Sequence, residues 1–264
     1  MDEVSEVVKV KIEGRVAIIT IENPPVNVLS EQVVLGLINA FKRIEEDSLV
    51  SAVILTGAGE KAFMAGADIK EFPTWLGRED MVQHVELNHQ LFNYIENLRK
   101  PTIAMLNGLT LGGGCELALS CDLRIAEEHA KIGLPEINLG IFPGGGGTQR
   151  LPKLVGISNA KELMFFGESI DATQALSISL VNKVTKTGEG LSLAKEWATK
   201  LSKKSLNSIN SIKEAMQYGY EHSFDEGIVK ETELFCKTFQ HQDAFEGINA
   251  FIEKRKPVFN KANE

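Results

Sequence analysis

Cysteine is scarce in this chain of 264 residues, which has only Cys115, Cys121 and Cys236. Their number is odd, and no spacing between them is the close pair typical of zinc sites and redox motifs. A zinc site or a redox motif built on cysteine is therefore disfavoured. We expect all three to be reduced, mostly buried thiols.

Positive charge and long apolar runs are also in short supply. Lysine and arginine number 28 against 36 aspartate and glutamate residues, which gives a net charge of −8, and the basic clusters that bind nucleic-acid phosphates are absent. No apolar run approaches membrane-spanning length, and the acidic segment Met1–Glu6 lacks the basic start of a signal peptide. The sequence predicts a cytoplasmic protein that binds neither nucleic acid nor a membrane.

Nucleotide and metal motifs are missing as well. Gly108 and Gly113 have the five-residue offset of a phosphate loop, but Gly114 stands where that loop needs lysine. The stretch from Gly57 to Gly59 continues without the third glycine of a dinucleotide fingerprint. The five histidines show no metal-ligand spacing. A classical ATP or dinucleotide site is therefore disfavoured, and we expect no metal site.

The chain does contain a regular alternation of strand and helix signals. Apolar and polar residues alternate on both sides of Glu13-Gly14, which predicts a hairpin, and helical spacing after Ser30 predicts a helix with Ser30 as its N-cap. The alternation predicts an α/β core. Further expected elements are a strand at 52–56, a helix at 81–98, a strand at 102–106, a helix up to 120, a strand at 123–126, a helix from about 144–147, a helix capped at 171 and an extended piece at 183–187.

The last part of the chain is expected to be nearly all helical. We divide the sequence into a core, residues 1–200, and a C-terminal helical region, residues 201–264. Between residues 206 and 256 the apolar positions exceed what one exposed helix buries alone. This region is therefore expected to pack either onto the core or onto another subunit.

Two glutamates stand in apolar, glycine-rich surroundings. Glu116 follows Gly112-Gly113-Gly114-Cys115, and Glu136 comes twenty residues later, after Leu134-Pro135. A glutamate in an apolar segment needs a reason beyond solubility. Backbone N–H groups in a glycine cluster before a helix can bind an oxyanion, although a tight strand-to-helix turn is the plainer explanation of a lone glycine triplet. Together these features point to an active site.

A second glycine-containing loop, at Phe63–Lys70, offers another backbone amide donor. With it, the motifs resemble the enoyl-CoA hydratase/isomerase family, also called crotonases. The matching pieces span nearly the whole chain in the family's order. They are Phe63–Lys70, Pro101–Asp122, Pro135-Glu136, Pro143–Leu151 and Asp243–Pro257.

The resemblance implies a crotonase-like α/β fold, which is a spiral of ββα units with a C-terminal helical region that covers the core and forms trimer contacts. It implies a homo-oligomer, either a trimer or a dimer of trimers. The implied substrate is an acyl-CoA thioester. No cofactor is implied, because coenzyme A is part of the substrate.

The resemblance also implies roles for individual residues. The backbone amides of Ala67 and Gly113 would hold the thioester carbonyl oxygen, Glu116 would mainly activate water, and Glu136 would mainly supply the α-proton. Because two carboxyls near one site couple, one of them is expected to have a raised pKa. Further substrate or CoA contacts are expected at Ala65, Gly66, Asp68, Ile69, Lys70 and Gly112, with Lys254, Arg255 and Lys261 as candidates near the phosphates.

Three features leave the acyl pocket open to more than one interpretation. Phe72 and Trp75 belong either to the enclosure of the acyl chain or to the core. The run Gly144–Gly147 forms either a pocket wall or a tight packing of backbone against the substrate loop. Met64 stands where small residues are frequent in the family, so the accepted chain length stays open.

The implied activity is reversible syn hydration of a trans-2-enoyl-CoA to the 3-hydroxyacyl-CoA, as in fatty acid β-oxidation. The nearest alternative is enoyl-CoA isomerisation or another acyl-CoA reaction of the family. The position of Glu116 is commonly not a glutamate in the isomerases, which favours the hydratase. A non-catalytic acyl-CoA- or RNA-binding homologue is a second alternative, and both the glutamate pair and the acidic charge count against it.

Overall fold

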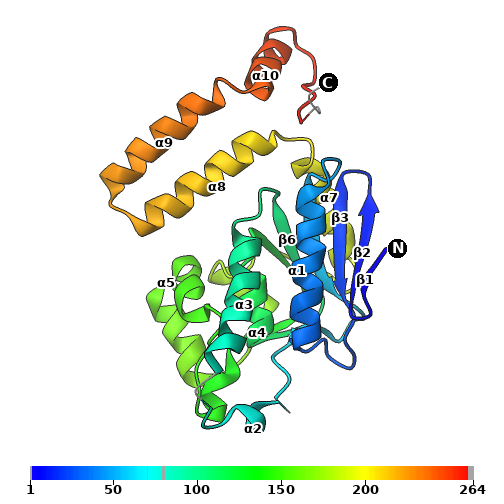
Figure 1. Cartoon of the computed structure of the whole chain (residues 1–264), viewed down its shortest axis with the longest axis vertical. Helices are drawn as coiled ribbons and strands as arrows, with labels where there is room; N and C mark the ends of the chain where they lie inside the picture. The colour runs from blue at the N-terminus through cyan, green and yellow to red at the C-terminus, as the bar shows by residue number, and fades with distance from the viewer. Residues whose placement is uncertain (1, 70, 79–80, 261–264) are drawn as a thin grey trace.

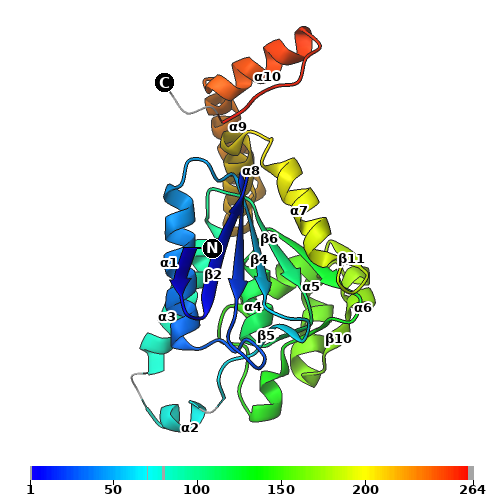
Figure 2. The ribbon, with the colours of Figure 1, turned by 90° about the vertical axis from the view of Figure 1, so that its right-hand side faces the viewer.

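The computed structural model describes residues 2–69, 71–78 and 81–260. Two sheets lie at its centre, a long one of seven strands and a short one of four. Helices cover the long sheet from both sides, and three C-terminal helices extend away from it (Figure 1; Figure 2). The α/β architecture expected from the strand–helix alternation is confirmed.

The long sheet begins as an antiparallel hairpin and continues as a parallel sheet. Its strand order is β1-β2-β3-β4-β6-β8-β11. Strand β2 pairs antiparallel with both β1 and β3, and every pairing from β3 to β11 is parallel. The strands are β1 (Asp2–Ser5), β2 (Val8–Glu13), β3 (Val16–Ile21), β4 (Ala52–Gly57), β6 (Thr102–Leu106), β8 (Leu123–Glu127) and β11 (Lys183–Thr185).

Both faces of the long sheet are buried. On one face, α1 (Glu31–Glu46) and α3 (Met81–Glu96) join the larger hydrophobic core, in which Phe41 and Phe92 are fully buried. On the other face, α7 (Gly190–Leu201) packs small alanines against the aliphatic side chains of the parallel strands. Burial of both sheet faces explains why β4 and β6 are mostly apolar, with one buried threonine in each.

Two helix starts expected from the sequence are confirmed. The hydroxyl of Ser30 accepts the amide of Val33 at 3.4 Å, at the start of α1. Asp171 and Gln174 form a reciprocal capping box before α6 (Ala172–Ser177). Each cap satisfies backbone N–H groups that the first helical turn leaves unpaired.

The short sheet was not expected from the sequence pattern. Its strand order is β10-β9-β7-β5, and its strands are too short to show a hydrophobic period. The loop expected at Phe63–Lys70 is shorter than predicted. Its first three residues belong to strand β5, and the loop begins at Gly66. The strands are β5 (Ala62–Ala65), β7 (Leu109–Leu111), β9 (Lys131–Gly133) and β10 (Ile170–Asp171).

The chain alternates between the two sheets and thereby forms the ββα units that the family resemblance implied. Strands β4 and β5 lead through α2 (Phe72–Trp75) to α3, strands β6 and β7 lead to α4 (Gly113–Leu119), and strands β8 and β9 lead to α5 (Gly147–Phe166). Strand β5 pairs with β7 in parallel, with Ala65 opposite Leu111. The loops after these two strands therefore leave the same edge of the short sheet.

A close backbone contact fixes α4 against β5. A Cβ on Gly114 would lie 2.1 Å from the carbonyl oxygen of Met64, whose side chain is fully buried. We expect Gly114→Ala to lower the free energy of unfolding by about 3 kcal/mol or more, because backbone must move to admit the methyl group. Urea unfolding monitored by circular dichroism measures the change.

Gly219→Ala is the matched control for this prediction. Gly219 lies within α8 (Leu206–Glu221), and a Cβ there would meet nothing within 4 Å. Alanine at this helical position is expected to be neutral or to stabilise by up to about 1 kcal/mol. Equal stability of the Gly114→Ala and wild-type proteins would contradict the contact.

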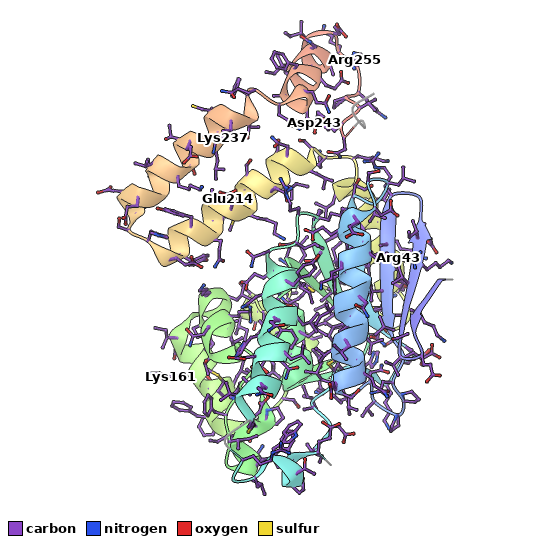
Figure 3. All side chains as sticks on the ribbon, viewed as in Figure 1. Arg43, Lys161, Glu214, Lys237, Asp243 and Arg255 are labelled. Carbon is purple, nitrogen blue, oxygen red and sulfur yellow. The ribbon has the colours of Figure 1, made fainter. Side chains whose placement is uncertain are left out.

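The C-terminal helices leave most of their large apolar side chains exposed. After α8 come α9 (Phe224–Thr238) and α10 (Gln242–Ile252), and the three lie apart from the sheets (Figure 3). The sequence analysis expected these side chains to pack either onto the core or onto another subunit. Most of them do not pack onto the core of the same chain. The exposed apolar residues of the tail include Ile212, Met216, Phe224, Ile228, Phe239, Phe245 and Phe251.

Two further expectations concern membranes and cysteines. Among the described helices, none is long and apolar enough to cross a membrane. All three cysteines are free thiols; Cys115 and Cys121 are buried as expected, whereas Cys236 on α9 is exposed.

Candidate active site

The loops after β5 and β7 open into a cavity of about 840 Å³. Phe72 and Trp75 line it, with ring centroids 5.1 Å apart, so they belong to the cavity wall. Asp68 is not among the lining residues, and Lys70 lies outside the described residues. The predicted site residues that line the cavity are Ala65, Gly66, Ala67, Ile69, Gly112, Gly113, Glu116 and Glu136.

The two predicted oxyanion donors sit where the chain turns out of the short sheet. Gly66, before Ala67, has φ +84°, and Gly112, before Gly113, has φ +52°, values that favour glycine. Among the described residues, the amides of Ala67 and Gly113 donate no backbone hydrogen bond outside the helix and strand ladders. Both amides are therefore suited to bind a ligand oxygen.

Glu116 is held by two backbone amides. Its side chain, from the buried face of α4, is 3% exposed. Its Oε1 accepts the amide of Gly145 at 2.7 Å and the amide of Gly147 at 2.8 Å. Burial raises the pKa of Glu116, while these two donors and the charge of Arg150 oppose that rise. Since both bonded partners are donors, they favour the ionised carboxylate.

The glycine run before α5 makes this approach possible. A Cβ on Gly145 would lie 2.6 Å from Glu116 Oε2, and a Cβ on Gly147 would lie 3.0 Å from Oε1. Gly144, Gly145 and Gly146 line the cavity, which supports the interpretation of this run as a pocket wall. The sequence analysis did not foresee the contact with Glu116, which spans about thirty residues and leaves no local pattern.

Glu136 has the opposite environment. It lies in the 3₁₀ helix η1 (Pro135–Leu139), and its buried Oε2 has no hydrogen-bond partner. Burial raises the pKa of Glu136 to about 7, with a further contribution from the charge of Glu116. A Cβ on Gly112 would lie 2.8 Å from Glu136 Oε1, so this glycine makes room for the carboxyl. The sequence analysis expected coupling between the two carboxyls to raise one pKa. In the structure burial is the larger cause for Glu136, and the charge of Glu116 adds to it.

The two glutamates therefore suit different protonation states at neutral pH. Glu116 receives two N–H donors, which an ionised carboxylate needs, whereas Glu136 receives none at its buried oxygen and favours the neutral acid. A base and an acid that face one cavity can exchange protons with a bound substrate and water.

Asp122 and Arg255 do not line this cavity. Asp122 accepts the amide and the hydroxyl of Thr102 at 2.8 and 2.9 Å and pairs with Lys213 at 2.9 Å, which is a structural role. Arg255 pairs with Glu246 at 2.7 Å. Lys261 lies outside the described residues. Within the described ranges, no three histidine, cysteine, aspartate or glutamate side chains are grouped as metal ligands.

Comparison with known sequences points to one family. A profile described as enoyl-CoA hydratase/isomerase matches residues 11–262. A short-chain-enoyl-CoA hydratase of Clostridium acetobutylicum is 45% identical over 248 residues, which cover 92% of this chain and 94% of the relative. A crotonyl-CoA hydratase of Syntrophomonas wolfei is 41% identical and covers 94% of this chain and 95% of its own.

Solved structures agree with the sequence relatives. An enoyl-CoA hydratase from Bacillus anthracis superposes with a TM-score of 0.91 at 38% identity, covering 97% of this chain and 99% of its own. The Pseudomonas aeruginosa protein DspI superposes with the same TM-score at 35% identity, covering 100% and 98%. The profile match over nearly the whole chain, the identity of its relatives and the ββα spiral agree, and the chain belongs to the enoyl-CoA hydratase/isomerase family.

Proposed function

We propose that this protein is an enoyl-CoA hydratase, which adds water reversibly and in syn fashion to a trans-2-enoyl-CoA to give the 3-hydroxyacyl-CoA. The observation that carries the proposal is the pair of carboxyls in one cavity, the buried Glu116 with two amide donors and the half-buried Glu136 with none at its buried oxygen. Hydration needs one base and one acid at the same time. Relatives named as hydratases over nearly the full chain support the same reaction.

The proposed steps use each group once. Glu116 takes a proton from water as the water oxygen bonds to the β-carbon, and Glu136 gives its proton to the α-carbon. Negative charge passes through the thioester oxygen as an enolate, which the amides of Ala67 and Gly113 would stabilise; one such donor is worth about 3–4 kcal/mol. Proton transfer from Glu116 back to Glu136 restores the starting state.

The other residues predicted for the site are part of the proposal. Ala65, Gly66, Asp68, Ile69 and Gly112 are proposed to contact the CoA thioester, as is Lys70 outside the described residues. We propose that no metal or redox cofactor takes part, because acid, base and oxyanion donors all come from the chain. The cytoplasmic location stays a prediction, which cell fractionation would test.

A homo-oligomer, either a trimer or a dimer of trimers, is part of the same proposal. The apolar side chains on α8, α9 and α10 that remain exposed in one chain support it, because a monomer rarely leaves so much apolar surface in water. Light scattering coupled to size-exclusion chromatography distinguishes monomer, trimer and hexamer. A monodisperse monomer would overturn the oligomer.

The decisive experiment follows the loss of enoyl-thioester absorbance with a series of trans-2-enoyl-CoAs of increasing chain length. We expect hydration of crotonyl-CoA, the shortest of the series, because relatives carry the names short-chain-enoyl-CoA and crotonyl-CoA hydratase. A folded protein that binds acyl-CoA but hydrates none of the series would refute the proposal, and isomerase substrates would then be tested.

A further inference from the structure

A buried cation lies next to the loop that holds Glu116. Arg150, near the start of α5, is 8% exposed. Its Nη1 donates to the carbonyl oxygen of Gly145 at 3.2 Å. Its Nε and Nη2 donate to Glu96 Oε2 on α3 at 3.0 and 2.7 Å, and Nη2 also donates to Asn93 Oδ1 at 2.6 Å. The guanidinium thereby ties the glycine loop to α3.

Gly145 hydrogen-bonds to both Arg150 and Glu116. Its carbonyl oxygen accepts Arg150 Nη1, and its amide donates to Glu116 Oε1 at 2.7 Å. The next residue, Gly146, has φ +100°, and a Cβ there would lie 2.3 Å from Arg150 Nη1. The loop is therefore shaped to receive the guanidinium on one side and the carboxylate on the other.

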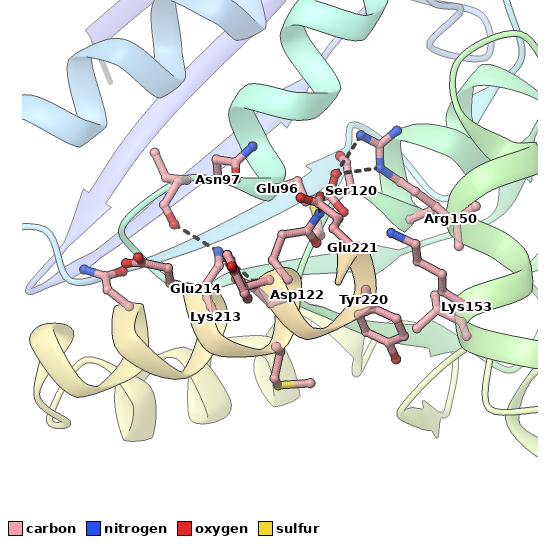
Figure 4. Close-up of a pocket in the computed structure, with 18 of the residues that line it drawn as sticks. Glu96, Asn97, Ser120, Asp122, Arg150, Lys153, Lys213, Glu214, Tyr220 and Glu221 are labelled. Atoms are coloured by element: carbon pink, nitrogen blue, oxygen red, sulfur yellow. Dashed lines mark hydrogen bonds and ion pairs between the residues drawn. The ribbon is translucent and has the colours of Figure 1, made fainter. Parts of the chain in front are cut away.

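Arg150 also faces a second cavity. This cavity, of about 560 Å³, lies between α8 and the core, and Arg150 and Glu96 form part of its wall (Figure 4). Glu96 is half-buried there, with its side chain 31% exposed, whereas the side chain of Arg150 is 9% exposed. The ion pair thus lines the second cavity and not the cavity that holds the two glutamates.

We propose that Arg150 is a positioning residue for the hydration reaction, which holds the Gly144–Gly147 loop so that two amides stay on Glu116 and which places a positive charge beside that loop. The inference rests on the proposed hydratase function. It assigns no contact between Arg150 and the substrate, since the guanidinium reaches Glu116 only through Gly145.

The charge of Arg150 gives the proposal a distinctive readout. It lowers the pKa of Glu116, against the effect of burial. Because the reaction needs Glu116 ionised, loss of this charge is expected to move the acid limb of the pH–rate profile to higher pH. The titratable and charged groups around this region are Cys115 on α4, Glu136 on η1, Arg150 on α5, and His89 and Glu96 on α3.

Three variants separate the charge from the hold on the loop. Arg150→Gln removes both, and kcat for crotonyl-CoA is expected to fall about 10- to 100-fold with KM nearly unchanged and the acid limb shifted upward. Glu96→Gln removes the charged partner that fixes Arg150 but keeps the cation. In this variant kcat is expected to fall less than in Arg150→Gln, and the acid limb is not expected to move upward. Arg150→Lys keeps the charge without the guanidinium fork, so the acid limb returns while kcat is only partly restored.

Lys153→Gln is the matched control. Lys153 is on the same helix and lines the second cavity, with its Nζ 5.2 Å from the ring centroid of Tyr220. Wild-type kcat and pH profile are expected. If Arg150→Gln does not fold, Arg150→Lys and Glu96→Gln carry the test. Both keep a cation at position 150, so both are expected to lower kcat without moving the acid limb upward, and wild-type kcat in both would overturn the proposal.

Two results would overturn the proposal. One is wild-type kcat and pH profile in Arg150→Gln. The other is a lower kcat in both Arg150→Gln and Arg150→Lys, with the acid limb of the pH–rate profile at its wild-type position in each. That result would mean that Arg150 only supports the fold. Failure of the wild-type enzyme to hydrate any enoyl-CoA would instead refute the proposed function, so the two failures are distinguishable.

Discussion

Glu116→Gln is expected to lower kcat for crotonyl-CoA hydration by about 10²- to 10⁴-fold, with little change in KM. The amide oxygen of glutamine can still accept the two N–H groups of Gly145 and Gly147, which bond to one carboxylate oxygen at 2.7 and 2.8 Å. The loop therefore keeps its place, and only the capacity to take a proton from water is lost. Steady-state kinetics with the enoyl-thioester absorbance measure the effect.

The chain offers a matched control for this substitution. Glu127 on β8 is also buried, at 4% exposure, and its Oε1 accepts the amide of Gly190 at 3.0 Å. It does not line the catalytic cavity. Glu127→Gln is expected to keep kcat within about 2-fold of wild type, a barrier change below about 0.5 kcal/mol. Equal hydration rates in Glu116→Gln and wild-type proteins would contradict the assigned base.

The site could be predicted from the sequence where chemistry conflicts with local composition. Glu116 and Glu136 stand out because a carboxylate among apolar residues and glycines is costly without a function. The amides at Ala67 and Gly113 followed from the glycine loops and the family resemblance, and the structure places all four residues around one cavity.

What the sequence did not reveal depends on contacts between distant segments. The amides of Gly145 and Gly147 reach Glu116 only because the spiral brings the start of α5 over α4, and no local period records that approach. The same holds for Arg150, whose burial against α3 no local pattern indicates. The short sheet was missed because strands of two to four residues carry too little pattern to recognise.

The tail shows a different limit. Its apolar excess was readable, and the structure leaves those side chains exposed on α8, α9 and α10. An amphipathic pattern states that a face must be covered, but it does not state by which surface. Whether another subunit covers the apolar face of α8, α9 and α10 is therefore a question for the light-scattering experiment and not for the sequence pattern.

Glu136→Gln is expected to lower kcat by about 10²- to 10⁴-fold, because the neutral amide fits the same buried place but cannot give a proton to the α-carbon. In the wild type, hydration needs Glu136 protonated, and burial raises its pKa to about 7. The hydration rate should therefore fall about tenfold per pH unit above that value. The residual activity of Glu136→Gln should lack this alkaline limb. An unchanged alkaline limb in the variant would show that another group supplies the proton.

The stability of the same variant gives an independent check on the acid. A carboxyl whose pKa is raised from 4.5 to about 7 on folding binds its proton more tightly in the folded state. Its contribution to stability is full below pH 4.5 and is lost as the pH rises to about 7, where the buried group ionises. Glu136→Gln should therefore unfold at a higher temperature than wild type at pH 8, and this advantage should shrink steadily as the pH falls toward 4.5. A difference in unfolding temperature that does not change with pH would mean that Glu136 is ionised in the folded protein, and the roles of the two carboxyls would then have to be exchanged.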